Sequence, residues 1–438
     1  MPLTIKEYLE RGPSTSREIQ AATGLSQSSA ARQLREMGDS VIRLPKGRSI
    51  RYAATCNAFG GNDKLHLSMV DAYGDAFLIA FIRPLSHGGF FVEPVTDIPP
   101  LLLGENNDGL YYDLPYFLFD LRPQGFLGRQ IAQEMASQSE DFPTDPRHWN
   151  TNQIGRYLMS NSDDLSGNLK FGEQAQLRIR RKPAIISDKD YPALADSVMN
   201  GSIPGSSAGG EQPKFTAFNS NRSSHVIVKF SPQGNNDLAN RWRDILITEY
   251  HASKIIHSRI FPTAETRLIE MRGRLFLETQ RFDRSGEYGR NSMISLQSID
   301  AEFTGLGSNW PQVLNALFRK KMVDEQDVFN AEFLWYFGRL INNTDMHLGN
   351  MSLAIEGEMF RLLPLYDMCS MGFAPRSGGE VQPFTFVPPT PKGSNISKDL
   401  VKTTKKIAFD FWKSLASDER ISGEFKNYLQ KGNPIGRM

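Results

Sequence analysis

A carboxylate and an amide stand five residues apart in residues 341–353, a segment rich in Asn. The carboxylate is Asp345 and the amide is Asn350. A carboxylate can take the proton of an attacking hydroxyl and an amide oxygen can bind Mg²⁺, so this pair at this spacing suits phosphoryl transfer. Asp367 follows the apolar residues 362–366, where a second carboxylate for the metal is expected. Taken singly, these residues also fit an Asn-rich turn or a solvated cap.

A lysine and a glycine-rich segment upstream supply the remaining parts of such a site. Lys229 lies in the mostly apolar residues 225–230, which predict a strand, and a lysine there is costly unless it is paired or functional. Glu249, on the predicted helix 238–256, is an available partner. Residues 201–215 are rich in Gly, so their backbone amides can approach phosphates. A surface loop and an edge-strand lysine explain these two features singly, but the joint order of all four parts favours a kinase site.

The elements that must position these residues change character along the chain. Residues 56–279 are predicted to form a β-rich lobe that includes the glycine-rich loop, and residues 280–438 a mainly helical catalytic lobe. A β-rich part followed by a helical part is the order of the lobes of protein kinases. The predicted fold class is therefore α+β, a two-lobed protein-kinase-like fold. Residues 56–200 contribute few signals beyond short strands.

Residues 1–55 predict a separate small domain, with three short helices followed by a β-hairpin. This is the element order of a winged helix-turn-helix. The segment holds nine basic and five acidic residues, so its net charge is +4. Two regions are predicted to contact DNA, the outward face of the third helix and the turn of the hairpin: Gln27, Ser28, Ser29, Arg32, Arg35, Lys46 and Arg48. A domain of this kind used only for protein contacts is the alternative.

Composition argues against several other classes of protein. The apolar runs fall far short of the roughly 20 residues that a membrane-spanning helix needs, so no membrane contact is expected. The first residues lack the uninterrupted apolar core of a signal peptide, which predicts a cytoplasmic location. Two cysteines are too few for a disulfide framework, and they have no partners at zinc-binding spacing.

Five motifs in a fixed order resemble those of the HipA-like toxin kinases, over roughly residues 200–420. They are SAGGEQPK at 207–214, VKF at 228–230, QRFDR at 280–284, NTDMHLGN at 343–350 and LYD at 365–367. The resemblance implies a serine/threonine protein kinase that uses ATP and Mg²⁺.

The same resemblance implies a role for each matching residue. Asp345 would be the catalytic base, Lys229 would contact the phosphates, and Asn350 and Asp367 would hold Mg²⁺. Three regions would bind ATP, namely the glycine-rich loop, the hinge and the catalytic segment: Gly209, Gly210, Glu211, Gln212, Pro213, Lys214, Lys229, Gln280, Arg281, Phe282, His347, Tyr366 and Asp367. Ser207, with Ser206 beside it, aligns with the loop serine whose autophosphorylation switches such kinases off.

The family further implies the partners of the chain. They are a translation-related protein substrate, such as an aminoacyl-tRNA synthetase or a translation factor, whose phosphorylation inhibits growth, and an antitoxin protein. DNA binding usually belongs to the antitoxin, whereas here the N-terminal segment would carry it. Two other functions remain open, a nucleotide-sensing transcription regulator without transferase activity and a small-molecule kinase. The presence of Asp345, Asn350 and Asp367 together favours transfer.

Overall fold

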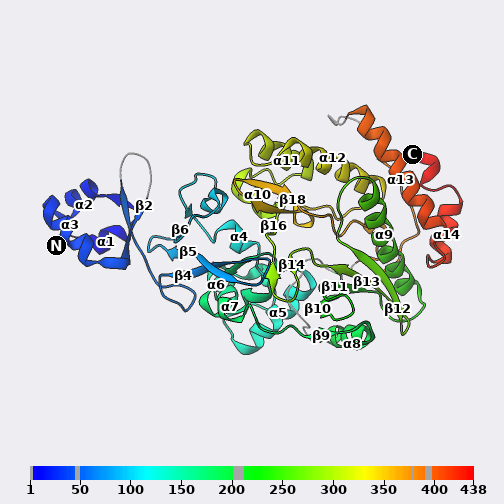
Figure 1. Cartoon of the computed structure of the whole chain (residues 1–438), viewed down its shortest axis with the longest axis horizontal. Helices are drawn as coiled ribbons and strands as arrows, with labels where there is room; N and C mark the ends of the chain where they lie inside the picture. Colours follow the sequence, from blue (N-terminus) through cyan, green and yellow to red (C-terminus); the bar gives the residue numbers. More distant parts are fainter. Residues whose placement is uncertain (1–2, 45–49, 201–211, 377, 390–396) are drawn as a thin grey trace.

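The computed structural model describes residues 3–44, 50–200, 212–376, 378–389 and 397–438, and these form a mixed α/β protein (Figure 1). Three parts follow one another along the chain. A small N-terminal part lies at one end, a middle part with its own sheet comes next, and a larger part with a second sheet and most of the long helices completes the molecule. Among the described residues, no helix has both the length and the apolar character that crossing a membrane requires.

The N-terminal part contains three short helices and a three-stranded sheet in the order β1-β3-β2. Its elements are α1 (Ile5–Leu9), β1 (Ser14–Thr15), α2 (Ser16–Thr23), α3 (Gln27–Glu36), β2 (Val41–Leu44) and β3 (Arg51–Ala54). Each helix begins at a capping hydroxyl, from Thr4, Thr15 and Ser26 respectively. The predicted helices and strands are therefore present. Their identification as a winged helix-turn-helix stays a prediction, and the hairpin turn with Lys46 and Arg48 lies outside the described residues.

The middle part is built on a five-stranded antiparallel sheet in the order β7-β6-β5-β4-β8. Its strands are β4 (Leu65–Val70), β5 (Ala76–Pro84), β6 (Phe90–Pro94), β7 (Leu110–Tyr111) and β8 (Leu169–Phe171), and its helices are α4 (Tyr116–Phe119), α5 (Gly125–Gln138), α6 (Thr151–Asn161) and α7 (Glu173–Arg178).

Arg83 on β5 joins this sheet to the N-terminal part. Its guanidinium is 1% exposed and donates to the Asp39 carbonyl at 2.6 Å, to Asp63 Oδ2 at 2.7 Å and to Glu93 Oε2 at 2.8 Å. Because these acceptors come from three separate segments, Arg83 fixes the junction between the two parts.

The second five-stranded sheet has the order β12-β13-β11-β10-β9. Its strands are β9 (Ile185–Ile186), β10 (Lys214–Asn219), β11 (Ser224–Phe230), β12 (Thr266–Met271) and β13 (Arg274–Gln280), and the helices α8 (Tyr191–Met199) and α9 (Asp237–Arg259) accompany them. On one face, Val226, Val228 and Phe230 pack with Tyr191 of α8. Since side chains alternate along a strand, Ile227 and Lys229 point to the opposite face. α9 contacts β11, β12 and β13.

The remaining part is mainly helical, as predicted for the C-terminal segment. It contains the small sheets β14 (Arg284–Ser285) with β15 (Gly289–Arg290) and β16 (Ile294–Ser295) with β17 (Ser352–Glu356) and β18 (Met359–Leu362), and the helices α10 (Leu296–Phe303), α11 (Trp310–Arg319), α12 (Glu325–Leu340), α13 (Lys398–Ala416) and α14 (Gly423–Gln430). One continuous apolar core joins these helices to the middle part. The predicted boundaries at residues 55 and 279 stay predictions, and both five-stranded sheets lie within residues 56–280.

Candidate active site

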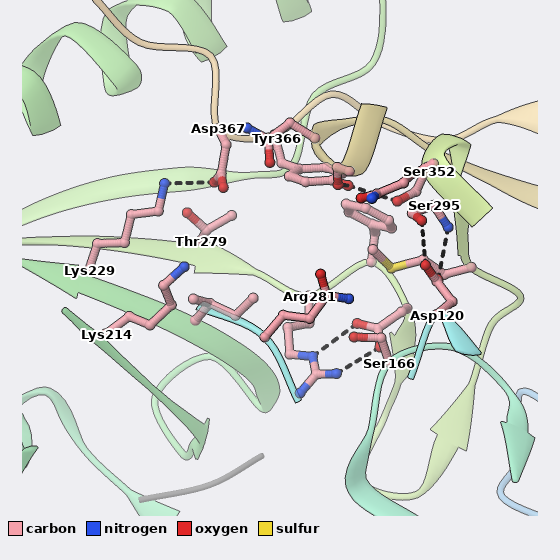
Figure 2. Close-up of a pocket in the computed structure, with 18 of the residues that line it drawn as sticks. Asp120, Ser166, Lys214, Lys229, Thr279, Arg281, Ser295, Ser352, Tyr366 and Asp367 are labelled. Atoms are coloured by element: carbon pink, nitrogen blue, oxygen red, sulfur yellow. Dashed lines mark hydrogen bonds and ion pairs between the residues drawn. The ribbon is translucent and has the colours of Figure 1, made fainter. Parts of the chain in front are cut away.

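Lys229 is held between two carboxylates, of which Figure 2 shows Asp367. Its Nζ lies 2.7 and 2.8 Å from the two carboxylate oxygens of Glu249 on α9, and 2.6 Å from Asp367 Oδ1. Lys229 and Glu249 are 6% and 3% exposed, so this is a buried ion cluster. The predicted pairing of Lys229 with Glu249 is confirmed, and Asp367 joins it from a segment 138 residues away.

Burial and charge compete within this cluster. Burial opposes the charge on Lys229, but Asp367 and Glu249 more than offset it, so the pKa of the ammonium lies above its ordinary value. Burial also opposes the charge on Asp367, yet Lys229 and Lys214 outweigh it and hold the pKa of this carboxyl below its ordinary value. For Glu249 burial dominates and raises the pKa. Asp367 is therefore ionised at neutral pH.

The backbone at Asp367 is held in an unusual conformation. Its φ of +54° lies in the left-handed region, which residues other than glycine rarely adopt. Leu365, two residues before Asp367, is anchored on both sides of its backbone. Its N–H donates to the Pro262 carbonyl at 2.9 Å, and its carbonyl accepts from the Ala264 N–H at 2.9 Å. Local strain of this kind persists where the surrounding structure enforces it, and it is concentrated at functional positions.

The segment after α12 orders Asp345 and Asn350 through local hydrogen bonds. The Asp345 N–H donates to Asn343 Oδ1 at 3.0 Å, and Asn350 Nδ2 donates to the Asp345 carbonyl at 2.7 Å. This bond turns the Asn350 Oδ1 away from Asp345, and no described donor contacts that oxygen. The Asp345 side chain is 51% exposed, and its carboxylate lies 3.8 Å from His347 Nε2.

A cavity of about 190 Å³ collects most of the predicted site residues. Nine of them line it: Lys214, Lys229, Gln280, Arg281, Phe282, His347, Asn350, Tyr366 and Asp367. Gln212, Pro213 and Asp345 do not line it. Ser206, Ser207, Gly209, Gly210 and Glu211 lie outside the described residues.

The predicted hinge, residues 280–282, forms one wall of this cavity, but most of its backbone groups already form hydrogen bonds. The Gln280 N–H donates to the Glu265 carbonyl and the Arg281 N–H to the His225 carbonyl, each at 2.9 Å. The Phe282 carbonyl accepts from Asn291 Nδ2 at 2.8 Å. Within the described part of the chain, the Phe282 N–H is the hinge donor that has no acceptor. The Phe282 ring lies 5.8 Å from the Tyr366 ring, which closes this end of the cavity.

Sequence reasoning missed three residues that the middle part contributes to the cavity: Gln124, and Asp120 and Ser166, which Figure 2 labels. The Asp120 carboxylate accepts from the Ser295 N–H at 3.0 Å, from the Ser298 hydroxyl at 2.8 Å and from the Ser295 hydroxyl. Ser295 caps α10 and pairs with Ser352 in the β16–β17 ladder. Asp120 thus holds the middle part against the strands beside Asn350. No local sequence motif indicates these contacts.

Asp283 of the QRFDR motif makes a second link to the middle part. It is 4% exposed, binds the Arg281 guanidinium at 2.9 and 2.8 Å and accepts from the Gly167 N–H at 3.2 Å. Because burial is more than offset by Arg281 and Arg284, the pKa of Asp283 lies far below its ordinary value. Asp283 therefore stays charged and fixes Arg281 at the cavity wall.

Comparison with known proteins matches both the middle and the last part of the chain. Residues 61–180 match the middle domain of YjjJ-like toxins, and residues 206–420 match the HipA-like C-terminal domain. The toxin YjjJ of Escherichia coli (strain K12) is 34% identical over 437 residues, which cover 98% of this chain and 96% of that protein. The chain belongs to the YjjJ-like toxin family. In this member of the YjjJ-like toxin family the cavity is assembled from both matched regions, with Asp120 from the first and Lys229 from the second.

The fold of this YjjJ-like family member is similar to that of a solved HipA structure. A chain from the complex of HipA, HipB and operator DNA of Shewanella oneidensis MR-1 superimposes with a TM-score of 0.58 at 17% identity, covering 84% of this chain and 95% of that one. At this identity the similarity establishes a HipA-like fold.

Proposed function

We propose that this member of the YjjJ-like toxin family is a serine/threonine protein kinase that uses ATP and Mg²⁺. The observation that carries the proposal is the ion cluster of Lys229, Glu249 and Asp367 at a cavity also lined by Asn350. A lysine held by a helix carboxylate and placed beside a metal-binding aspartate is the arrangement that positions nucleotide phosphates in kinases. Lys214, the strand neighbour of Lys229, is a second cation for the same phosphates.

The residues present fit Mg²⁺ bound together with a nucleotide. Among the described residues, no group of three or more His, Cys, Asp and Glu side chains could hold a metal alone. Mg²⁺ in nucleotide sites typically takes one or two protein oxygens, with phosphates and waters completing its shell. The ionised Asp367 and the Asn350 Oδ1 would supply the two protein oxygens, and the bound cation would neutralise charge on the phosphates.

Asp345 would act as the base for the substrate hydroxyl. Its carboxylate is half exposed, so a protein substrate can reach it, whereas Lys229 and Asn350 are buried. His347 lines the cavity and its Nε2 lies 3.8 Å from the Asp345 carboxylate, so Asp345 would face the phosphates from the edge of the cavity.

Nucleotide binding is the first test of this proposal. By isothermal titration calorimetry, a non-hydrolysable ATP analogue should bind the wild-type chain in the presence of Mg²⁺, and Asp367→Ala should weaken that binding at least tenfold by removing a ligand. Asp345→Asn should bind like the wild type, as should Asp97→Asn, an exposed control of equal chemistry. Absence of Mg²⁺-dependent binding to the wild type would contradict the proposal. The second test is transfer of the ATP γ-phosphate to a protein, an activity that a nucleotide-sensing regulator would lack.

Growth inhibition and DNA binding complete the proposed function. The Escherichia coli relative is named a toxin, which supports growth inhibition. We extend the proposal to a translation-related protein substrate in the cytoplasm on the motif resemblance alone. The HipA complex with HipB and operator DNA supports an antitoxin partner and a DNA partner. Gln27, Ser28, Arg32 and Arg35 of α3 are exposed and Ser29 is half-buried, which supports DNA contact by this face.

The DNA proposal has a separate test in a gel-shift assay with the full chain. Arg32→Ala should relax base preference, and Lys46→Ala with Arg48→Ala should weaken binding to every sequence and flatten its salt dependence. Binding that is equal for all sequences and disappears at moderate salt would overturn the regulatory part and leave the kinase part intact.

A further inference from the structure

A second cavity, of about 420 Å³, lies beside the hinge. Its wall comes from the segment after α7, from the end of β10 and from the β14–β15 hairpin. It shares Arg281 with the candidate active site, whereas Lys229, Asn350 and Asp367 line the active-site cavity and not this one. The proposed nucleotide site therefore does not account for it.

Basic side chains outnumber acidic ones on the wall of this cavity, by five to three. They are Arg178, Arg181, Lys182, Arg281 and Arg290. Behind the wall lie Arg284, 6% exposed, and the fully buried Lys170, whose Nζ donates to the carbonyls of Leu165 and Gly167 at 2.8 and 2.9 Å. Burial, reinforced by Arg284 and Arg290, lowers the pKa of Lys170 well below its ordinary value and opposes a charge on this residue, so the positive charge of the site is assigned to the basic residues of the wall.

Three carboxylates also line the cavity, and each of them is already engaged with another group. Asp163 pairs with Arg178 at 2.8 Å, Asp164 with Arg284 at 3.1 Å, and Glu287 accepts from the Tyr288 hydroxyl at 2.8 Å. In the described part of the chain, no carboxylate forms an ion pair with Arg181, Lys182 or Arg290.

Arg290 is the wall residue with the least satisfied charge. It is 5% exposed, and its Nη1 donates to the carbonyls of Tyr288 and Gly289 at 2.7 and 3.1 Å. Its Nε is buried with no hydrogen-bond acceptor among the described residues, and the same is true of Arg178 Nε. Arg290 is thus a charged wall residue without an ion pair among the described residues, and an anion in the cavity would supply its counter-charge.

The titration of neighbouring groups agrees with an excess of positive charge. Burial, reinforced by Arg281, lowers the pKa of Arg284 to about 9. Burial, reinforced by the nearby arginines, lowers the pKa of His225, which lines the cavity, to about 4. His225 is thus neutral at pH 7 and adds no charge to the wall.

We infer that this cavity binds a small phosphate-class anion, such as a phosphate monoester or pyrophosphate, at a site separate from the candidate active site. Arginine forks match phosphate oxygens through paired, charge-assisted hydrogen bonds. The walls come from both matched regions of the chain, so the bound anion would also stabilise their junction.

Binding of pyrophosphate to the full chain tests this inference. Thermal unfolding would be followed against pyrophosphate concentration at constant ionic strength, because a ligand of the folded state raises the midpoint as it saturates its site. In Arg181→Gln with Lys182→Gln, affinity should fall about tenfold or more through the loss of charged donors. The matched control is Arg180→Gln with Lys189→Gln, two exposed residues nearby that do not line the cavity. This control should bind like the wild type.

The outcomes separate the inference from general charge screening and from the active site. The inference is supported if pyrophosphate raises the thermal midpoint saturably in the wild type and in the control, but not in Arg181→Gln with Lys182→Gln. Equal affinity in all three proteins overturns it, because the anion then binds elsewhere, and so does an equal midpoint shift with chloride at matched ionic strength. Arg290→Lys, which keeps the charge but removes the fork, should also weaken binding, and unchanged affinity in this variant would contradict the assigned wall.

Discussion

Replacing Lys229 with Met would leave two carboxylates facing each other without their cation. The unpaired charge on Glu249 would cost more than that on Asp367, because the Glu249 side chain is 4% exposed whereas that of Asp367 is 27% exposed and reaches water. Removing one partner of a buried pair costs about 3–5 kcal/mol, since the remaining charge is uncompensated. We therefore expect Lys229→Met to lower the free energy of unfolding by about this amount.

A second substitution identifies the source of that loss. Lys229→Met with Glu249→Gln removes the stranded charge and should be more stable than Lys229→Met alone, by about 2 kcal/mol. Urea denaturation followed by tryptophan fluorescence measures both. Lys64→Met is the control, because Lys64 pairs with Asp39 at a similar 2.6 Å but at the surface, where such a pair contributes less than about 1 kcal/mol. A double variant that is no more stable than Lys229→Met would refute the charge pairing.

The same reasoning fixes the sign of the pH dependence. The pKa of Asp367 in the wild type is lowered, so its contribution to stability is present above the ordinary aspartate value of 3.8 and is lost as pH falls through the folded-state value. In Lys229→Met the stranded carboxylates can instead take up protons as pH falls, which removes their repulsion. The stability gap between the two proteins should be widest near pH 7 and should narrow towards pH 4 and below. A gap that widens on acidification would contradict the assignment.

Two further predictions concern the contacts that join the parts of the chain. Asp120→Ala removes the hydrogen bonds to Ser295 and Ser298, and it should lower the rate of phosphoryl transfer about tenfold with only a small change in the thermal midpoint. Asp120→Asn should recover part of that rate. An unchanged rate in Asp120→Ala would show that these bonds do not position the site. Arg83→Met should destabilise the junction with the N-terminal part by about 3–5 kcal/mol, which limited proteolysis would detect as faster cleavage between residues 55 and 64. The control Arg156→Met removes an ion pair at the surface and should cost less than about 1 kcal/mol. Equal rates of cleavage in the two variants would contradict the role given to Arg83.

The sequence predicted the parts of the site whose chemistry is visible locally. A lysine in an apolar strand needs a counter-charge, and that requirement alone pointed to Glu249 on the following helix, which spans Asp237–Arg259 where residues 238–256 were predicted. Asp345 and Asn350 were found from their spacing, and Asn350 Nδ2 donates to the Asp345 backbone carbonyl, so the two residues lie side by side while their roles stay predictions.

The parts that the sequence did not predict depend on long-range contacts. Asp120 lies in a segment without a recognisable motif, and its partners Ser295 and Ser298 follow 175 and 178 residues later. Arg83 likewise meets acceptors that are spread over three segments. Hydrophobic periodicity reports which face of an element is buried, but not which distant element covers it. The packing of the middle part against the second sheet around one cavity was therefore not predictable from the residues alone.

Transfer of the γ-phosphate from labelled ATP is the measurement that tests the central claim most directly. Purified wild-type chain, Asp345→Asn and the exposed control Asp97→Asn would each be incubated with Mg²⁺, labelled ATP and a cell lysate. Loss of a catalytic base typically costs 10²–10⁴-fold in rate, so Asp345→Asn should transfer at least about a hundredfold more slowly while it binds the ATP analogue normally. The wild type and Asp97→Asn should label the same protein on serine or threonine. Labelling by Asp345→Asn at the wild-type rate, or no labelling by the wild type despite Mg²⁺-dependent nucleotide binding, would contradict the kinase assignment.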